Sequence, residues 1–219
     1  MKLTRQVHLD FHTSEHLKEI GSCFNKSEFQ ESLIKAKVNS INLFAKCHHS
    51  WSYYPTKIGR IHPNLNFDLL GEQIGAAREV GIKVFVYYTM GWSSNDAENH
   101  PEWCARNKDG SFIIHGSSEN DSKSRLEESL PHYYWKFLCV NTGYHELIRN
   151  QIQELSKQYE VDGFWFDIYQ VHRLCYCENC RSDMSLGNID INDDSDVESF
   201  NALKIKEHCR DLNSVIFEN

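Results

Sequence analysis

The sequence has no run of about eighteen apolar residues, so no segment of it is predicted to cross a membrane. Its first residues, Met1–Val7, lack the apolar stretch of a secretory signal. There is no stripe of Lys and Arg either, and the net charge of −8 disfavours nucleic acid as a partner. We therefore expect a cytoplasmic protein that binds neither membranes nor nucleic acid.

The sequence also lacks a glycine-rich phosphate loop after its first apolar run, where His12-Thr13-Ser14-Glu15 stands instead. This absence disfavours a dinucleotide-binding fold. No internal repeat is visible. The 219 residues suit one globular domain, but they are few for a complete (β/α)₈ barrel, which usually needs about 250 residues.

Short apolar runs alternate with helical patterns along the chain. The runs that predict strands are Val7–His12, Ile41–Lys46, Val84–Thr89, Gly163–Ile168 and, at the end, Val215–Phe217. The patterns that predict helices are Glu28–Lys37 with Ser27 as N-cap, Asp68–Val80, Tyr144–Tyr159 and Val197–Leu212. Because strands and helices alternate, we expect an α/β fold with a parallel sheet, either a barrel or a doubly wound sheet.

One connection, residues 91–140, is long and polar and contains Trp92. Loops of this length in a compact domain are usually functional or disordered. We expect it to lie on the side of the active site. The chain is also rich in aromatic residues, at 12%, which suits either a sugar-binding cleft or a well-filled core.

The strand Gly163–Ile168 carries a carboxylate near its end, at Asp167. An acidic residue at this place lies at the C-terminal mouth of a parallel sheet, where barrel enzymes carry out catalysis. Asp167 is therefore a candidate nucleophile or acid/base. The alternative is an Asp that only caps the next segment.

Two adjacent histidines, His48 and His49, follow the second strand and stand beside Trp51. They can hydrogen-bond sugar hydroxyls while the indole ring stacks on a sugar face, or they can be surface residues. In an extended chain they point in opposite directions, so a metal shared by both is disfavoured. A metal-dependent hydrolase would also need a carboxylate ligand, to which the sequence does not point.

Three cysteines form a C-x-C-x-x-C motif at Cys175, Cys177 and Cys180. Thiolates so close together favour Zn²⁺ or an iron–sulfur cluster. Without a secretory signal they are expected to be reduced or metal-bound. A fourth thiol is needed, and the motif leaves the choice open among Cys23, Cys47, Cys104 and Cys139.

Several segments together resemble the family called hypothetical glycosyl-hydrolase 6, a barrel family related to α-L-fucosidases and β-galactosidases. They are His8–His12, Phe44–Thr56, which begins Phe-Ala-Lys-Cys-His-His, His100–Trp103 and Asp162–Asp167. The resemblance extends over nearly the whole chain. It implies that this chain is the N-terminal portion, about five strands, of a (β/α)₈ TIM barrel in a single domain over residues 1–219.

The resemblance also implies roles for individual residues. Asp167 matches the fucosidase nucleophile at the end of strand four. His12, His48 and His49 match histidines that contact the sugar. We add Trp51, Trp92 and Trp165 as aromatic candidates for the sugar site.

A further likeness, to family-42 β-galactosidases, concerns the cysteines. Those enzymes hold a structural zinc with C-x-C-x-x-C after strand four and a fourth Cys in a segment before helix three. Here Cys139 fills that place, so the resemblance implies one structural Zn²⁺ on Cys139, Cys175, Cys177 and Cys180. Their catalytic Glu has no counterpart at Asp167, so their chemistry is not implied.

The expected function is that of a retaining glycoside hydrolase, fucosidase- or galactosidase-like, with a carbohydrate substrate. The second carboxyl group of such an enzyme is missing, and Asp10 and Glu218 are weak candidates for it. The alternative is a carbohydrate-binding or interaction module without turnover, left by a truncated barrel. Because an incomplete barrel exposes strand edges, we also expect self-association or poor solubility.

Overall fold

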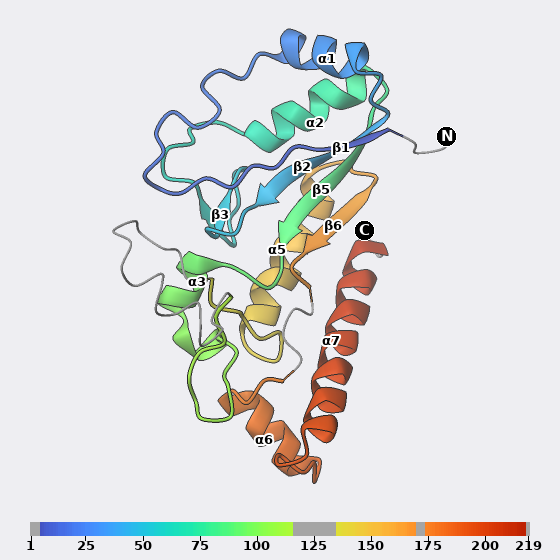
Figure 1. Ribbon diagram of the computed structural model, residues 1–219. Coiled ribbons are helices and arrows are strands. Elements are labelled where there is room, and N and C mark those ends of the chain that lie inside the picture. The colour runs from blue at the N-terminus through green and yellow to red at the C-terminus, as the bar shows by residue number, and fades with distance from the viewer. Residues whose placement is uncertain (1–4, 116–134, 170–173, 218–219) are drawn as a thin grey trace. The chain divides into compact units, whose positions relative to one another are not determined.

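The computed structural model describes residues 5–115, 135–169 and 174–217 (Figure 1). The described residues form two compact units: the first consists of residues 5–89 and 150–167, and the second of the remainder. No described helix has both the length and the apolar character that a membrane crossing requires. The expectation of one domain over residues 1–219 stays a prediction.

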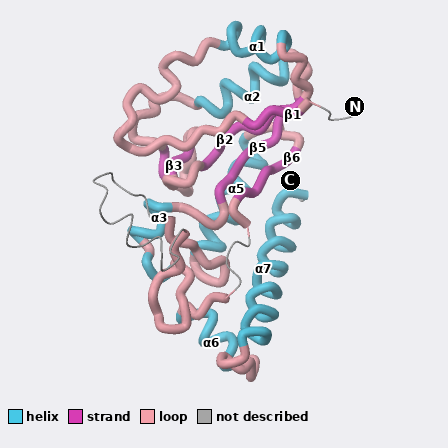
Figure 2. The backbone as a smooth tube through the Cα atoms, viewed as in Figure 1, coloured by secondary structure: helices cyan, strands magenta, loops and turns pink. Residues whose placement is uncertain are grey.

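The first unit is built on a parallel sheet (Figures 1 and 2). Its four main strands, β1 (Gln6–His8), β2 (Ser40–Lys46), β5 (Lys83–Thr89) and β6 (Gly163–Asp167), lie side by side in chain order. Every residue of β2 is buried, as expected for a strand covered on both faces. The predicted α/β fold with a parallel sheet is confirmed.

Three details of this sheet differ from the prediction. β1 ends at His8, so His12 lies beyond the strand and not at its end. Two short strands were missed, β3 (Trp51–Ser52) and β4 (Arg60–Ile61). β3 pairs antiparallel with the end of β2 at Lys46, which turns the chain after His48 and His49 back toward the sheet.

One helix lies between β1 and β2 in the sequence and one between β2 and β5, and both are close to the predicted positions. α1 (Lys26–Lys35) begins earlier than predicted, because the side chain of Asn25, not Ser27, accepts the hydrogen bond of a free backbone N–H. α2 (Leu69–Glu79) is capped by Asp68, and its buried face packs against β2, β5 and α1.

The C-terminal half of α5 (Tyr144–Gln158) also belongs to the first unit. Its Gln151 is fully buried and accepts a hydrogen bond from the hydroxyl of Tyr88 at 2.7 Å. The same side chain donates to Ser52 and Tyr54. α5 therefore holds the segment after β2 in place through polar contacts.

The second unit contains α3 (Ser94–Asn99), the 3₁₀ helix η1 (Pro101–Trp103), the first half of α5, α6 (Glu178–Leu186) and α7 (Asp194–Phe217). The segment predicted as one long loop, residues 91–140, thus contains two short helices. Its residues 116–134 lie outside the described part of the chain. The core of this unit includes Cys139, Cys175, Cys177 and Cys180 together with Phe137, Tyr176, Met184 and Phe200.

The predicted fifth strand is wrong, because Val215–Phe217 forms the last turn of α7. The buried residues of this helix include Ile205, Leu212 and Val215. Their spacing fits the helical period, so the apolar face of α7 continues through Val215. Val215 and Ile216 are β-branched and favour a strand, but burial of this apolar face along the helix outweighs that local preference.

Candidate active site

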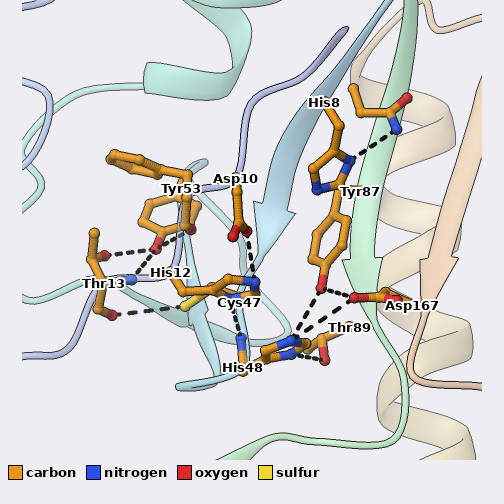
Figure 3. A network of polar contacts seen from close by, with 12 residues as sticks. His8, Asp10, His12, Thr13, Cys47, His48, Tyr53, Tyr87, Thr89 and Asp167 are labelled. Carbon is orange, nitrogen blue, oxygen red and sulfur yellow. Dashed lines mark hydrogen bonds and ion pairs between the residues drawn. The ribbon is translucent and has the colours of Figure 1, made fainter. Parts of the chain in front are cut away.

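Asp167 ends β6 and Thr89 ends β5, and the register pairs these two residues at the C-terminal edge of the sheet. Tyr87 lies two residues before Thr89 and so on the same face of β5. Its hydroxyl donates a hydrogen bond to Oδ2 of Asp167 at 2.8 Å (Figure 3). The side chain of Asp167 is 37% exposed, so the carboxylate stays accessible from outside.

His48 follows β2 and lies beside the same carboxylate. Its Nε2 is 3.9 Å from Oδ2 of Asp167 and 3.5 Å from the hydroxyl of Tyr87, and its Nδ1 is 2.7 Å from Oγ1 of Thr89. Burial, and then the nearby ring of His12, lowers the pKa of His48 to about 3. His48 is therefore neutral at neutral pH.

His12 joins this group through its ring, which stacks on that of His48 with centroids 3.9 Å apart. Its Nδ1 accepts a hydrogen bond from the backbone N–H of His48 at 3.2 Å. Its Nε2 lies 3.0 Å from Oδ1 of Asp10. Burial lowers the pKa of His12, although the carboxylates of Asp10 and Asp167 oppose that shift.

The backbone is strained immediately after the carboxylate. Ile168 has φ +56°, a left-handed conformation that a β-branched residue rarely adopts. Ser50, directly after the two histidines, has φ +76°. Residues with strained backbone are common at functional sites, because they persist only where the surrounding structure fixes their conformation.

The other predicted histidine, His49, faces a different neighbourhood. Charge interactions link it to Glu15 and His62, and burial lowers its pKa to about 4. Trp51 belongs to the same neighbourhood, because its indole N–H donates to Glu15 and its ring contacts His62 edge-on. His49 and Trp51 thus form a second polar cluster beside the group around Asp167.

The two remaining tryptophans lie in different places. Trp165 is two residues before Asp167 on β6, and its side chain is next to His8 and 47% exposed. Trp92 belongs to the second unit, where its ring stacks on Trp135 and contacts His115 and Phe137.

Of the predicted site residues, the structure brings His12, His48 and Asp167 into contact. Prediction from the sequence missed Tyr87 and Thr89, which complete the group. A signal for them was present: β5 ends at Thr89, and strand alternation places Tyr87 on the same face. Glu218, a candidate second carboxylate, lies outside the described residues.

The four cysteines selected from the sequence lie together in the second unit. Their sulfur atoms are all within 4.8 Å of one another, and all four residues are buried. The sulfurs of Cys139 and Cys180 are 3.6 Å apart. Hydrogen bonds among the thiols lower the pKa of Cys177 but raise that of Cys139, so the four sulfurs share their protons unevenly. The group can hold a metal ion.

The surroundings of these sulfurs suit a metal–thiolate centre. The amide of Asn141 donates to the sulfur of Cys180 at 3.6 Å and to Asp183 at 3.2 Å. Asp183 in turn pairs with Lys204 at 2.9 Å. Donors to the sulfur and a nearby cation compensate the negative charge that a four-thiolate centre would carry. Cys180 is on the first turn of α6, where the helix dipole also favours negative charge.

The sequence matches one family of known proteins. The chain matches the family described as "Hypothetical glycosyl hydrolase 6" over residues 25–168, which is more than half of its length. No curated protein matches the sequence significantly.

Among solved structures, the α-L-fucosidase isoenzyme 2 from Paenibacillus thiaminolyticus is similar to the chain, with 38% identity and a TM-score of 0.85. This likeness covers 99% of the chain but only 31% of the fucosidase. A GH29 α-L-fucosidase from Bacteroides thetaiotaomicron is 22% identical, with a TM-score of 0.44 over 67% of the chain and 27% of its own length. The chain therefore spans about a third of the first fucosidase.

Proposed function

Because the chain belongs to the hypothetical glycosyl hydrolase 6 family, a glycoside hydrolase-like family, we propose that it forms part of a retaining glycoside hydrolase with Asp167 as nucleophile. The similarity to the Paenibacillus fucosidase favours an α-L-fucoside as substrate. The sheet of the first unit would be the N-terminal part of a (β/α)₈ barrel. Because the chain spans only 31% of that fucosidase, both the activity and the substrate of the whole enzyme are proposals.

One observation supports the proposal most strongly. Asp167 is a partly exposed carboxylate at the C-terminal end of a parallel strand, where Tyr87 and His48 converge on one of its oxygens. A nucleophile needs such an arrangement, because it must be both accessible and held in one orientation. His12, His48 and His49 are proposed to line the sugar site beside this carboxylate.

The test uses trapping and not turnover. A 2-deoxy-2-fluoro-fucosyl fluoride should form an ester with Asp167, which peptide mass spectrometry locates. Asp167→Asn should give no adduct, and Asp162→Asn, a change at an Asp that pairs with Lys83, should still give one. Absence of any adduct on the wild-type chain contradicts catalysis by this chain.

The alternative, carbohydrate binding without turnover, has one observation in its favour. The second carboxyl group of a retaining site must lie about 5–5.5 Å from the first, and Asp10, the candidate within the described part of the chain, is engaged with His12. Binding of L-fucose in calorimetry together with absent labelling supports this alternative. Labelling of Asp167 excludes it.

We further propose that the four cysteines hold one structural Zn²⁺. Four sulfurs about 2.3 Å from a central ion lie about 3.8 Å apart in a tetrahedron, close to the 3.6 Å between Cys139 and Cys180. Four thiolates leave no position open for substrate, so the role is structural. The likeness of this segment to family-42 β-galactosidases remains a proposal.

The remaining expectations are also proposals. All eight cysteines lie in the described part of the chain and none of them is in a disulfide, which suits the cytoplasm as the proposed location. A carbohydrate is the proposed ligand, and neither nucleic acid nor a membrane is proposed as a partner. Self-association through the open edges of the sheet is proposed as well, and it has its own test below.

A further inference from the structure

The direction of the hydrogen bonds around His48 follows from counting protons (Figure 3). Tyr87 has one hydroxyl proton, and its hydroxyl donates this proton in the hydrogen bond to Oδ2 of Asp167, with 2.8 Å between the two oxygens. Burial, and then the hydrogen bond to Asp167, raises the pKa of Tyr87, so this proton is retained. Toward His48 the oxygen of Tyr87 can therefore only accept.

The Nε2 atom of His48 faces two acceptors. It is 3.5 Å from the oxygen of Tyr87 and 3.9 Å from Oδ2 of Asp167. A neutral imidazole has one N–H and one lone pair. A lone pair on Nε2 would face both oxygens unfavourably, whereas an N–H at this position is attracted by both. The single proton of His48 is therefore on Nε2.

With its proton on Nε2, His48 has a lone pair on Nδ1. The atom nearest to it is Oγ1 of Thr89 at 2.7 Å, a normal length for a hydrogen bond to a hydroxyl. Because Nδ1 can only accept in this tautomer, the hydroxyl of Thr89 must donate. Each contact in the group now has one consistent direction.

We propose that Thr89, His48 and Tyr87 form a one-directional chain of hydrogen bonds that ends on Oδ2 of Asp167 and leaves Oδ1 as the oxygen that attacks the sugar. Within the described residues, no hydrogen bond reaches Oδ1. Thr89 and His48 are positioning residues, because they act on the carboxylate through Tyr87. The part concerning attack rests on the proposed function.

The attack step is simple with a glycosyl fluoride. Oδ1 forms a bond to the anomeric carbon, the bond from that carbon to fluorine breaks, and fluoride leaves with the electron pair. No proton is needed for this leaving group. Oδ2 becomes the carbonyl oxygen of the ester and still accepts from Tyr87, so the chain of hydrogen bonds persists through the step.

The experiment measures the tautomer of His48 directly. Long-range ¹H–¹⁵N NMR of the histidine-labelled chain at neutral pH distinguishes a protonated from an unprotonated ring nitrogen. Loss of signals in His48→Gln assigns the resonances. We expect a protonated Nε2 and an unprotonated Nδ1 in the wild type. A protonated Nδ1 overturns the proposal.

Two variants at Thr89 test the first link. Thr89→Val keeps the shape but removes the donor to Nδ1, so Nε2 should stay protonated while the ¹⁵N signal of Nδ1 shifts toward that of a lone pair that accepts no hydrogen bond. Thr89→Ser restores the hydroxyl and should restore the wild-type Nδ1 signal. His12 is an internal control, because its Nδ1 accepts from the backbone N–H of His48 and should stay unprotonated in both variants. An Nδ1 signal of His48 that is the same in Thr89→Val and in the wild type overturns the role of Thr89.

The last link is tested at Tyr87. Tyr87→Phe removes the donor that orients Oδ2, so the carboxylate loses its fixed orientation and labelling of Asp167 by the fluoro sugar should slow by about 10- to 100-fold. An unchanged labelling rate overturns this link. If the tautomers are as proposed but no labelling occurs, the proposed function fails and the hydrogen-bond chain stands. If labelling occurs while Nδ1 of His48 is protonated, the proposed function stands and the hydrogen-bond chain fails.

Discussion

The sulfur of Cys139 lies 3.6 Å from that of Cys180, although 41 positions separate the two residues in the sequence. Cys175 and Cys177 complete the group, and Cys180 is on α6. Metal binding here therefore connects segments that are otherwise joined by apolar packing and by a few hydrogen bonds, such as the one from Asn141 to Asp183. The stability of the second unit should depend on the metal.

Removal of the metal should destabilise the protein. We expect about one Zn²⁺ per chain in elemental analysis, and a strong chelator or Cys177→Ser should lower the melting temperature by several degrees, because the centre is lost. Cys23→Ser, a change at an exposed cysteine, is the matched control and should leave both the metal content and the melting temperature unchanged. A wild-type chain with far less than one metal ion and four freely alkylated thiols contradicts the site.

Substitution of the proposed nucleophile should separate chemistry from folding. Asp167→Asn should reduce hydrolysis of an aryl α-L-fucoside to background, because an amide is too poor a nucleophile to form the glycosyl-enzyme. Its circular dichroism and melting temperature should stay close to wild type, since the amide oxygen can still accept from Tyr87. A variant that retains near wild-type hydrolysis contradicts the role.

Stability should fall as the solution becomes acidic between pH about 6.5 and 3. The pKa of His48 is about 3 and that of His49 about 4 in the folded chain, against 6.5 for an unperturbed histidine. In this window the unfolded chain binds protons that the folded chain does not, so the free energy of unfolding decreases as pH falls. Each histidine contributes at most about 1.4 kcal/mol per pH unit.

Urea unfolding at a series of pH values measures this slope. His48→Gln should flatten it, because one of the buried neutral histidines is removed. His16→Gln, at a side chain that is 78% exposed, is the control and should leave the slope unchanged. A slope that is the same in wild type and His48→Gln shows that His48 is not held neutral by the fold.

The edge of the sheet should promote self-association. Within the described residues, β6 pairs only with β5, and Trp165 on β6 is 47% exposed. Edges of this kind join other strands unless they are covered. Sedimentation velocity at micromolar concentration should therefore detect dimers or larger species, and Trp165→Lys should shift the distribution toward monomer. A monomeric wild-type chain contradicts the expectation.

Two glycines allow a matched test of packing. A Cβ on Gly59 would lie 2.2 Å from Nε2 of Gln151, whose side chain is fixed by three hydrogen bonds, so Gly59→Ala should destabilise the chain by about 1–3 kcal/mol. A Cβ on Gly75, within α2, meets nothing within 4 Å. Gly75→Ala should be stabilising by about 0.5–1 kcal/mol. Chemical denaturation of both variants measures the difference.

The alternation of apolar runs and helical patterns was enough to predict the parallel sheet, because strands that are buried on both faces form nearly continuous apolar runs. The position of Asp167 at a strand end likewise predicted its place at the C-terminal edge. Both conclusions depend on local periodicity, which the sequence contains directly.

Two features depended on tertiary structure: the conformation of residues 215–217 and the identity of the residues that contact Asp167. Val215–Phe217 has the composition of a strand, but burial of one continuous face of α7 makes it helical. Cys139 was one of four candidate fourth ligands in the motif analysis and was selected by the resemblance alone, whereas its closeness to the other three sulfurs is a property of the tertiary structure. Tyr87 and Thr89 joined the site because β5 and β6 are paired in one register, a relation between segments that neither segment specifies alone.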